Sequence, residues 1–191
     1  RSSVISEDDT HVKRVIFSPA ILAKVVFADP ELTLGLPPAV TAATGIDALT
    51  HAIESFVGNW TSPTSDGMAL TATGLIFANL RTAYREGSNL AAREKMALAS
   101  TYAGLAFTRA NVGYVHAIAH QFGGRYHTPH GLANAIVLPH VLRFSLPDIT
   151  DRLAELAVRA RLGEDGEDEA VLAQKFIDGV VALERDLGIP T

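Results

Sequence analysis

The sequence changes character at Pro37, and this change limits what the chain can fold into. Before it, two short runs of β-branched or aromatic residues, 15–17 and 24–27, are each followed within a few positions by proline. Such runs are typical of strands that end in loops. From Pro37 onward, apolar residues recur at the spacing of amphipathic helices, and a proline pair suits a helix start, where no backbone N–H is needed. The sequence therefore predicts an extended N-terminal segment followed by a helical body.

The helical body is predicted to consist of seven helices. We expect them at about residues 37–57, 65–86, 90–109, 115–122, 130–144, 149–161 and 167–187, with Gly58-Asn59 ending the first and Gly123-Gly124 the fourth. Two strands cannot form a stable sheet of their own. Residues 1–36 are therefore expected to belong to another layer that this chain lacks, and residues 37–191 to form a domain of their own. The predicted fold class is mainly α.

The composition excludes several classes of protein. The chain has 191 residues, of which 48% are hydrophobic and 19% charged, which is enough to bury a core. Its net charge of -5 offers no basic surface for nucleic acid. No apolar run approaches the ~20 residues of a membrane-spanning helix, so a cytoplasmic protein is expected. The absence of cysteine excludes disulfides and thiolate metal sites.

Histidines and one aspartate form a pattern that indicates a metal site. Asp47 and His51 are four residues apart, as are His116 and His120, so each pair shares one face of a predicted helix. Two facing helices with such pairs can build a metal site in a helical core. Imidazole and carboxylate ligands suit Zn(II), Fe(II), Mn(II), Co(II) or Ni(II). The spacing does not choose which four of six candidates bind: Asp47, His51, His116, His120, His127 and His130.

Two other polar features have a functional and a structural interpretation. Glu54, one turn after His51, could orient that histidine as a carboxylate behind the ligand, or be a solvated helix residue. Lys13-Arg14 could hold a phosphate or simply flank a strand. Motifs of phosphate loops, serine nucleophile elbows and zinc proteases are absent from the sequence.

Two long segments carry a resemblance to a known family. ADPELTLGLPPAVTAATGIDALTHAIESFV and VHAIAHQFGGRYHTPHGLANAIVLPHVLRF resemble the iron-containing (group III) alcohol dehydrogenases, and the similarity runs from about Lys13 to the final LERDLGIPT. The branch is that of lactaldehyde reductase and butanol dehydrogenase. The resemblance implies an all-helical metal-binding domain, of the dehydroquinate synthase-like type, that follows an α/β nucleotide-binding domain.

The resemblance also implies roles for individual residues. The metal, Fe(II) or alternatively Zn(II), would be held by Asp47, His51, His116 and His130. His120 matches a histidine near the metal and the nicotinamide that helps proton transfer, and Lys13 matches a lysine near the dinucleotide, NAD or NADP. His127 matches a variable position and receives no role.

The implied reaction is hydride transfer between NAD(P) and a small alcohol or aldehyde, in an enzyme expected to be a homodimer. The family's Gly-rich phosphate loop is not in this chain, and the family's last helices continue beyond its final GIP segment. We therefore expect a piece of a longer enzyme that is inactive without the missing nucleotide-binding domain. Two alternatives stay open at this point: a metal-binding helical domain without activity of its own, and a metallohydrolase that uses metal-bound water.

Overall fold

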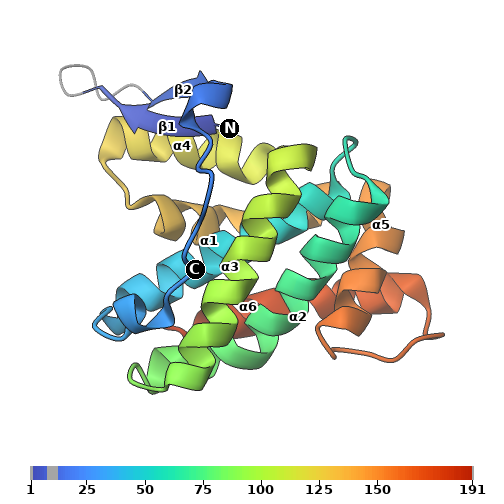
Figure 1. The fold of residues 1–191 in the computed structure, drawn as a ribbon. Coiled ribbons are helices and arrows are strands. Elements are labelled where there is room, and N and C mark those ends of the chain that lie inside the picture. Colours follow the sequence, from blue (N-terminus) through green and yellow to red (C-terminus); the bar gives the residue numbers. More distant parts are fainter. Residues whose placement is uncertain (1, 8–12, 191) are drawn as a thin grey trace.

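Helices make up most of the computed structural model, which describes residues 2–7 and 13–190 (Figure 1). The elements follow in the order β1 (Ser2–Ser6), β2 (Lys13–Phe17), the short 3-10 helices η1 (Pro19–Ile21) and η2 (Pro30–Thr33), α1 (Pro38–Val57), α2 (Pro63–Arg85), α3 (Leu90–Ala110), α4 (Tyr114–Tyr126), α5 (His130–Arg159) and α6 (Glu169–Asp186). The mainly α fold class is confirmed.

Two helix boundaries differ from the prediction. α2 begins earlier, at Pro63, because Ser62 is its N-cap and forms a reciprocal capping box with Ser65, whereas Ser65 or Asp66 was the expected cap. α4 continues through Gly123-Gly124 to Tyr126, and its C-cap His127 has a φ of 54°, in the left-handed region. Glycine weakens a helix without obliging it to end.

Other features have local causes. The break expected before residue 149 is present inside α5: Ile149 has non-helical backbone angles (φ -133°, ψ 21°), and two helical segments meet there at a kink. Pro147 lies just before this kink, and a proline inside a helix removes a backbone hydrogen bond and crowds the preceding turn. Residues 24–27 are not a strand but an exposed segment, because no strand among residues 2–7 and 13–190 pairs with them.

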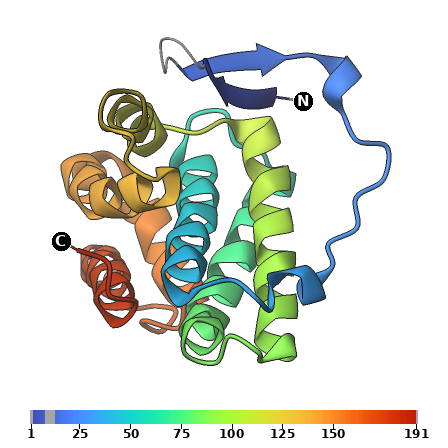
Figure 2. The ribbon, with the colours of Figure 1, turned by 90° about the vertical axis from the view of Figure 1, so that its left-hand side faces the viewer.

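The core of the helical body is built around α1. This helix packs against α2, α3 and α5, while α5 also contacts α4 and α6 (Figure 2). The largest fully buried side chains of α1 are Ile46, Leu49, Ile53 and Phe56. Small residues allow the helices to approach closely; a Cβ on Gly45 would lie 2.3 Å from a methyl group of Leu80. None of the described helices is both long and apolar enough to cross a membrane.

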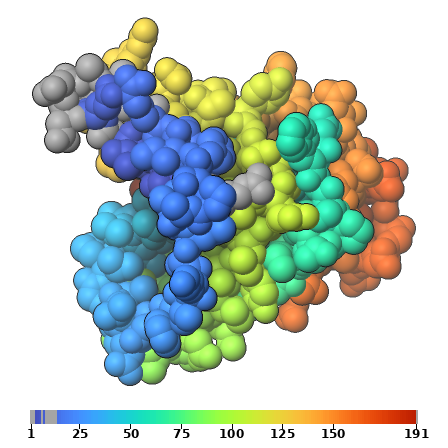
Figure 3. All heavy atoms as spheres, turned by 45° about the horizontal axis from the view of Figure 1, so that its top comes forward, coloured from blue at the N-terminus to red at the C-terminus, as the bar shows by residue number. Residues whose placement is uncertain are grey.

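The N-terminal segment has no core of its own. β1 and β2 pair antiparallel, with Ser2 opposite Phe17, and no described residue before Thr41 is buried. Consecutive residues of the hairpin are exposed, so neither face is covered; Ile16 is 42% and Phe17 67% exposed. The segment that follows β2 lies as a raised ridge over the helices (Figure 3). The division into a remnant at 1–36 and a domain at 37–191 fits these features but stays a prediction.

A buried carboxyl group lies near the end of α6. Glu184 is 2% exposed, and its Oε1 has no hydrogen-bond partner among the residues that the structure describes. Burial raises the pKa of Glu184 from 4.5 to about 8, against a smaller opposing influence of the Arg143 charge. The folded chain therefore favours the protonated carboxyl group.

This burial predicts a stability that falls with pH. Between pH 4.5 and 8 the unfolded chain has lost the Glu184 proton while the folded chain retains it, so the free energy of unfolding decreases through this window. Glu184→Gln should remove this contribution and raise Tm by roughly 4 °C or more at pH 8, with a smaller gain at pH 5. Thermal melts at both pH values test this, with the exposed Glu94→Gln as control. Equal gains at the two pH values would contradict it.

Candidate metal centre

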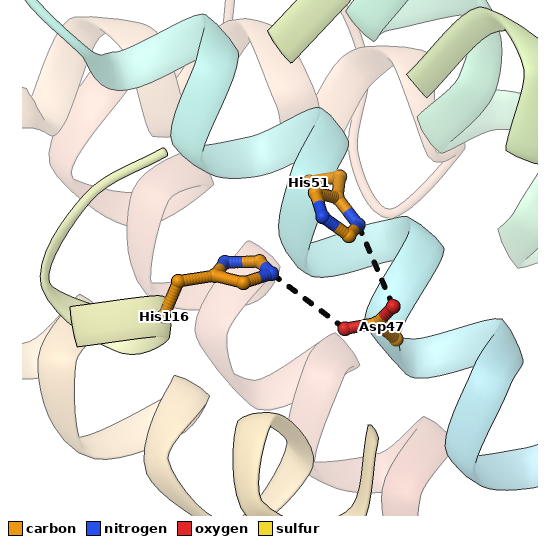
Figure 4. Close-up of side chains that lie close together, drawn as sticks. All are labelled: Asp47, His51 and His116. Atoms are coloured by element: carbon orange, nitrogen blue, oxygen red, sulfur yellow. Dashed lines mark ion pairs between the residues drawn. The ribbon is translucent and has the colours of Figure 1, made fainter. Parts of the chain in front are cut away.

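Asp47 lies between two histidines that come from different helices (Figure 4). On α1, Oδ2 of Asp47 is 3.6 Å from Nδ1 of His51. Across the helix interface, Oδ1 of Asp47 is 3.6 Å from Nε2 of His116, on the first turn of α4. The ligand atoms of these three residues lie within 4.8 Å of one another. The i,i+4 spacing predicted from the sequence therefore places Asp47 and His51 on one face, and tertiary packing adds His116.

His130 and His120 complete the group. His130 is the first residue of α5, and its Nε2 lies 3.3 Å from Oδ1 of Asp47. The ring of His120, on α4, stacks on that of His130 with centroids 5.2 Å apart. His120 thus lies beside the cluster, next to a residue whose imidazole faces the Asp47 carboxylate.

The spacing of these atoms fits a bound metal ion. A metal held by bonds of about 2.1 Å in tetrahedral geometry keeps its ligand atoms about 3.4 Å apart, and the separations from Asp47 are 3.3 to 3.6 Å. Nε2 of His116 is buried and, within the described part of the chain, has no hydrogen-bond partner. A buried nitrogen left without a partner costs free energy, and a metal ion would supply that partner.

Glu54 holds His116, whereas the sequence left open whether it orients His51 or is a solvated helix residue. Its Oε2 is 2.6 Å from Nδ1 of His116, and its Oε1 accepts a hydrogen bond of 2.6 Å from the backbone N–H of Val115. The N-cap residue Gly113 supplies no side chain, so the carboxylate from α1 caps the first turn of α4. A Cβ on Gly113 would lie 3.1 Å from Oε1 of Glu54. Glu54 thereby turns Nε2 of His116 toward Asp47.

A close contact between α5 and α1 positions His130. A Cβ on Gly131 would lie 2.4 Å from the backbone oxygen of Ala43, one turn before Asp47. Only glycine permits this approach. The first residue of α5 is therefore carried to the face of α1 from which Asp47 projects.

The charges in the cluster are strongly coupled. Burial alone would raise the pKa of Asp47, but attraction to His116, His51 and His130 lowers it overall. Burial lowers the pKa of His51 to about 4 despite the nearby Asp47 carboxylate. Burial would also lower the pKa of His116, but Asp47 and Glu54 raise it to about 9. The two carboxylates thus favour the protonated form of His116, whereas burial favours the neutral form of His51.

A cavity of about 690 Å³ opens beside the cluster. His51, His116, His120 and His130 all line it, as does Phe107, whose ring stacks on His51 with centroids 4.4 Å apart. Ser3, Val4, Val15 and Phe17 of the hairpin also line the cavity. The arrangement places a group of possible metal ligands beside a mostly apolar chamber. The sequence indicated the ligands but not the chamber.

Two residues singled out in the sequence lie elsewhere or outside the description. Lys13 begins β2, but its side chain is outside what the structure describes. His127 forms the C-cap of α4 and is exposed. It does not line the cavity beside the cluster. The spacing had left it among six candidate ligands, and the family resemblance gave it no role.

Comparison with known proteins identifies the family. The family model described as "Fe-containing alcohol dehydrogenase family, C-terminal" matches residues 41–191. The chain belongs to the iron-containing alcohol dehydrogenase family. It is 47% identical over 190 residues to a 1,3-propanediol dehydrogenase of Klebsiella pneumoniae, covering 100% of this chain and 49% of that relative.

Solved structures agree with this assignment. The crystal structure of a 1,3-propanediol oxidoreductase has a TM-score of 0.95 and 47% identity, covering 100% of this chain and 50% of that one. A sulfoacetaldehyde reductase of Bifidobacterium kashiwanohense, solved in complex with NAD+, has a TM-score of 0.89 and 32% identity, covering 100% and 48%. The chain thus spans about half the length of the relatives that it matches.

The Glu54 contacts predict a loss of metal affinity in Glu54→Gln. The amide removes the negative charge beside His116 and presents a donor to Nδ1, which disturbs the tautomer that directs Nε2 to the site. We expect the Kd for Zn(II) or Fe(II) to rise about 10- to 100-fold, measured by competition with a chromophoric chelator. Glu94→Gln, on the exposed face of α3, is the control. An unchanged Kd in Glu54→Gln would contradict this role.

The Gly131 contact predicts that a single methyl group displaces His130. Gly131→Ala has to move α5 away from the backbone of Ala43, so we expect metal binding to weaken at least about 10-fold and the fold to lose about 1–3 kcal/mol. Gly104→Ala on α3 is the matched control, because nothing lies within 4 Å of its Cβ position. That control should be neutral or stabilising. Parent-like metal affinity in Gly131→Ala would refute the argument.

Proposed function

We propose that the protein containing this chain is a metal-dependent alcohol dehydrogenase that transfers hydride between NAD(P) and a small alcohol or aldehyde. The observation that carries this proposal is the group of Asp47 and three histidines at one wall of an apolar chamber of about 690 Å³. A relative is named for its action on 1,3-propanediol, so short primary alcohols and diols are the substrate class to test.

The metal would be held by Asp47, His51, His116 and His130. Fe(II) is favoured by the family and Zn(II) is the alternative, since both accept imidazole and carboxylate ligands. When bound, the metal supplies Lewis-acid polarisation of the substrate oxygen. The His116 ring is held for this role by Glu54, and His51 is held by stacking on Phe107.

The side chains around the chamber provide the other requirements of hydride transfer. Val4, Val15 and Phe17 of the hairpin add apolar side chains to its lining. His120 lines the same chamber beside His130. In alcohol oxidation, the imidazole of His120 would accept the proton of the substrate hydroxyl, and in aldehyde reduction it would return it.

The dinucleotide would be bound mainly by the half of the protein that this chain does not contain. The NAD+ complex of the related sulfoacetaldehyde reductase supports a nicotinamide cofactor, and Lys13 is our candidate for a contact with it. The uncovered apolar residues of the hairpin fit a surface that packs against the missing nucleotide-binding domain. The homodimer and the cytoplasmic location expected from the sequence stay predictions.

Metal analysis of ligand variants tests the proposal. Asp47→Ala and His130→Ala should lose most of the bound Fe or Zn, and His140→Ala, an exposed histidine on the same helix as His130, should retain it. In the whole protein, the two ligand variants should also lose NAD(P)-dependent oxidation of 1-propanol and 1,3-propanediol by at least about 1000-fold. Unchanged metal content in both ligand variants would remove the proposed ligand set.

Activity measurements separate the rival functions. Residues 1–191 alone should show little or no turnover, because the Gly-rich phosphate loop is not among them. Efficient NAD(P)H-dependent aldehyde reduction by this chain alone would contradict that expectation. Metal-dependent hydrolysis of a model ester, without alcohol oxidation by the whole protein, would favour the metallohydrolase instead.

A further inference from the structure

Asn134 has contacts with two of the proposed metal ligands. It lies one turn after His130 on α5 and is fully buried. Its Nδ2 is 2.5 Å from Oδ1 of Asp47 and 3.1 Å from Nε2 of His130. Its Oδ1 is buried and has no hydrogen-bond partner among the described residues. A buried oxygen without a partner is costly. Because only the amide nitrogen has partners among the described residues, the contacts of that nitrogen orient the amide.

These contacts fix the hydrogens as well as the heavy atoms. A carboxylate oxygen accepts hydrogen bonds, and Oδ1 of Asp47 lies 2.5 Å from the amide nitrogen of Asn134. The amide must therefore present Nδ2 to Asp47. Because Nδ2 can only donate, Nε2 of His130 must be the acceptor in the second contact. His130 is thereby held in the tautomer whose Nε2 lone pair faces Asp47.

We propose that Asn134 is a positioning residue for the metal centre: its amide orients the Asp47 carboxylate and selects the His130 tautomer that binds metal through Nε2. Oδ1 of Asp47 has lone pairs for both the amide and a metal ion. Nε2 of His130 has a single lone pair, which it gives to either the amide or the metal. Asn134 thus orients Asp47 and His130 before a metal ion binds, and it can continue to hold Asp47 afterwards. The inference rests on the metal site of the proposed function.

Two substitutions separate hydrogen bonding from packing. Asn134→Leu keeps the approximate shape of the side chain and removes the hydrogen-bond donor. Asn134→Ala removes the donor and most of the side chain without adding bulk, and it serves as the test if the leucine variant does not fold. Thr50→Val is the matched control, because Thr50 is fully buried on the same helix as Asp47 and its hydroxyl donates to Ile46. The intact protein and the three variants are compared.

The first measurement is Zn(II) and Co(II) affinity by chelator competition, with the visible absorption of the Co(II) forms as a reporter of coordination. We expect both Asn134 variants to bind at least about 10-fold more weakly and to show altered Co(II) bands, and Thr50→Val to behave like the parent. A leucine variant with the parent's affinity and spectrum would overturn the inference, because packing alone would then explain Asn134.

The second measurement is the tautomer of His130 in the metal-free protein, from long-range ¹H–¹⁵N NMR correlations. The parent should show an unprotonated Nε2, and the Asn134 variants should show a mixture of tautomers. An unchanged tautomer would count against the inference. A parent that binds no metal at all would instead refute the metal site of the proposed function, so the two failures are distinguishable.

Discussion

The carboxylate of Glu54 connects the helical scaffold to the metal centre. One oxygen accepts the backbone N–H of Val115 in the first turn of α4, and the other contacts Nδ1 of His116 in the same turn. Glu54 itself is 5% exposed on α1, the helix that also carries Asp47 and His51. One buried group therefore sets both where α4 begins and how its histidine faces the ligands of α1.

Close helix packing brings the third element to the same place. Gly131 lets α5 contact the backbone of α1 at Ala43, so His130 and Asn134 reach the same oxygen of Asp47 that faces His116. The centre thus lies where three helices meet. The carboxylate of Glu54 connects α1 to α4, and the absence of a side chain at Gly131 lets α5 approach α1. A site built in this way is sensitive to changes that touch no ligand, because a small shift of one helix alters every separation from Asp47.

The hairpin links the site to the remainder of the protein. It contributes side chains to the lining of the chamber, yet no described residue of the N-terminal segment is buried. An isolated two-stranded hairpin is marginally stable in water. This part of the lining therefore depends on burial that the described residues do not provide, which agrees with a chain that spans about half the length of its relatives.

The sequence by itself determined the features that depend on local spacing. Proline at residue 37 and the helical recurrence of apolar residues predicted α1, and the i,i+4 spacing placed Asp47 and His51 on one face of it. The strand at 15–17 and the six candidate ligands were also visible, because each depends on residue type and neighbours along the chain. The family resemblance narrowed the six to Asp47, His51, His116 and His130, a choice that stays a prediction.

Tertiary structure decided which groups meet across helices. The partner of Glu54 is His116, 62 positions away, and not His51 on its own helix. Asn134 could have been noticed one turn after His130, but only the packing of α5 on α1 shows that its amide reaches Asp47. The passage of α4 through Gly123-Gly124 likewise had no local signal. Sequence periodicity gives the face of a helix, whereas the neighbour of that face depends on how all the helices pack together.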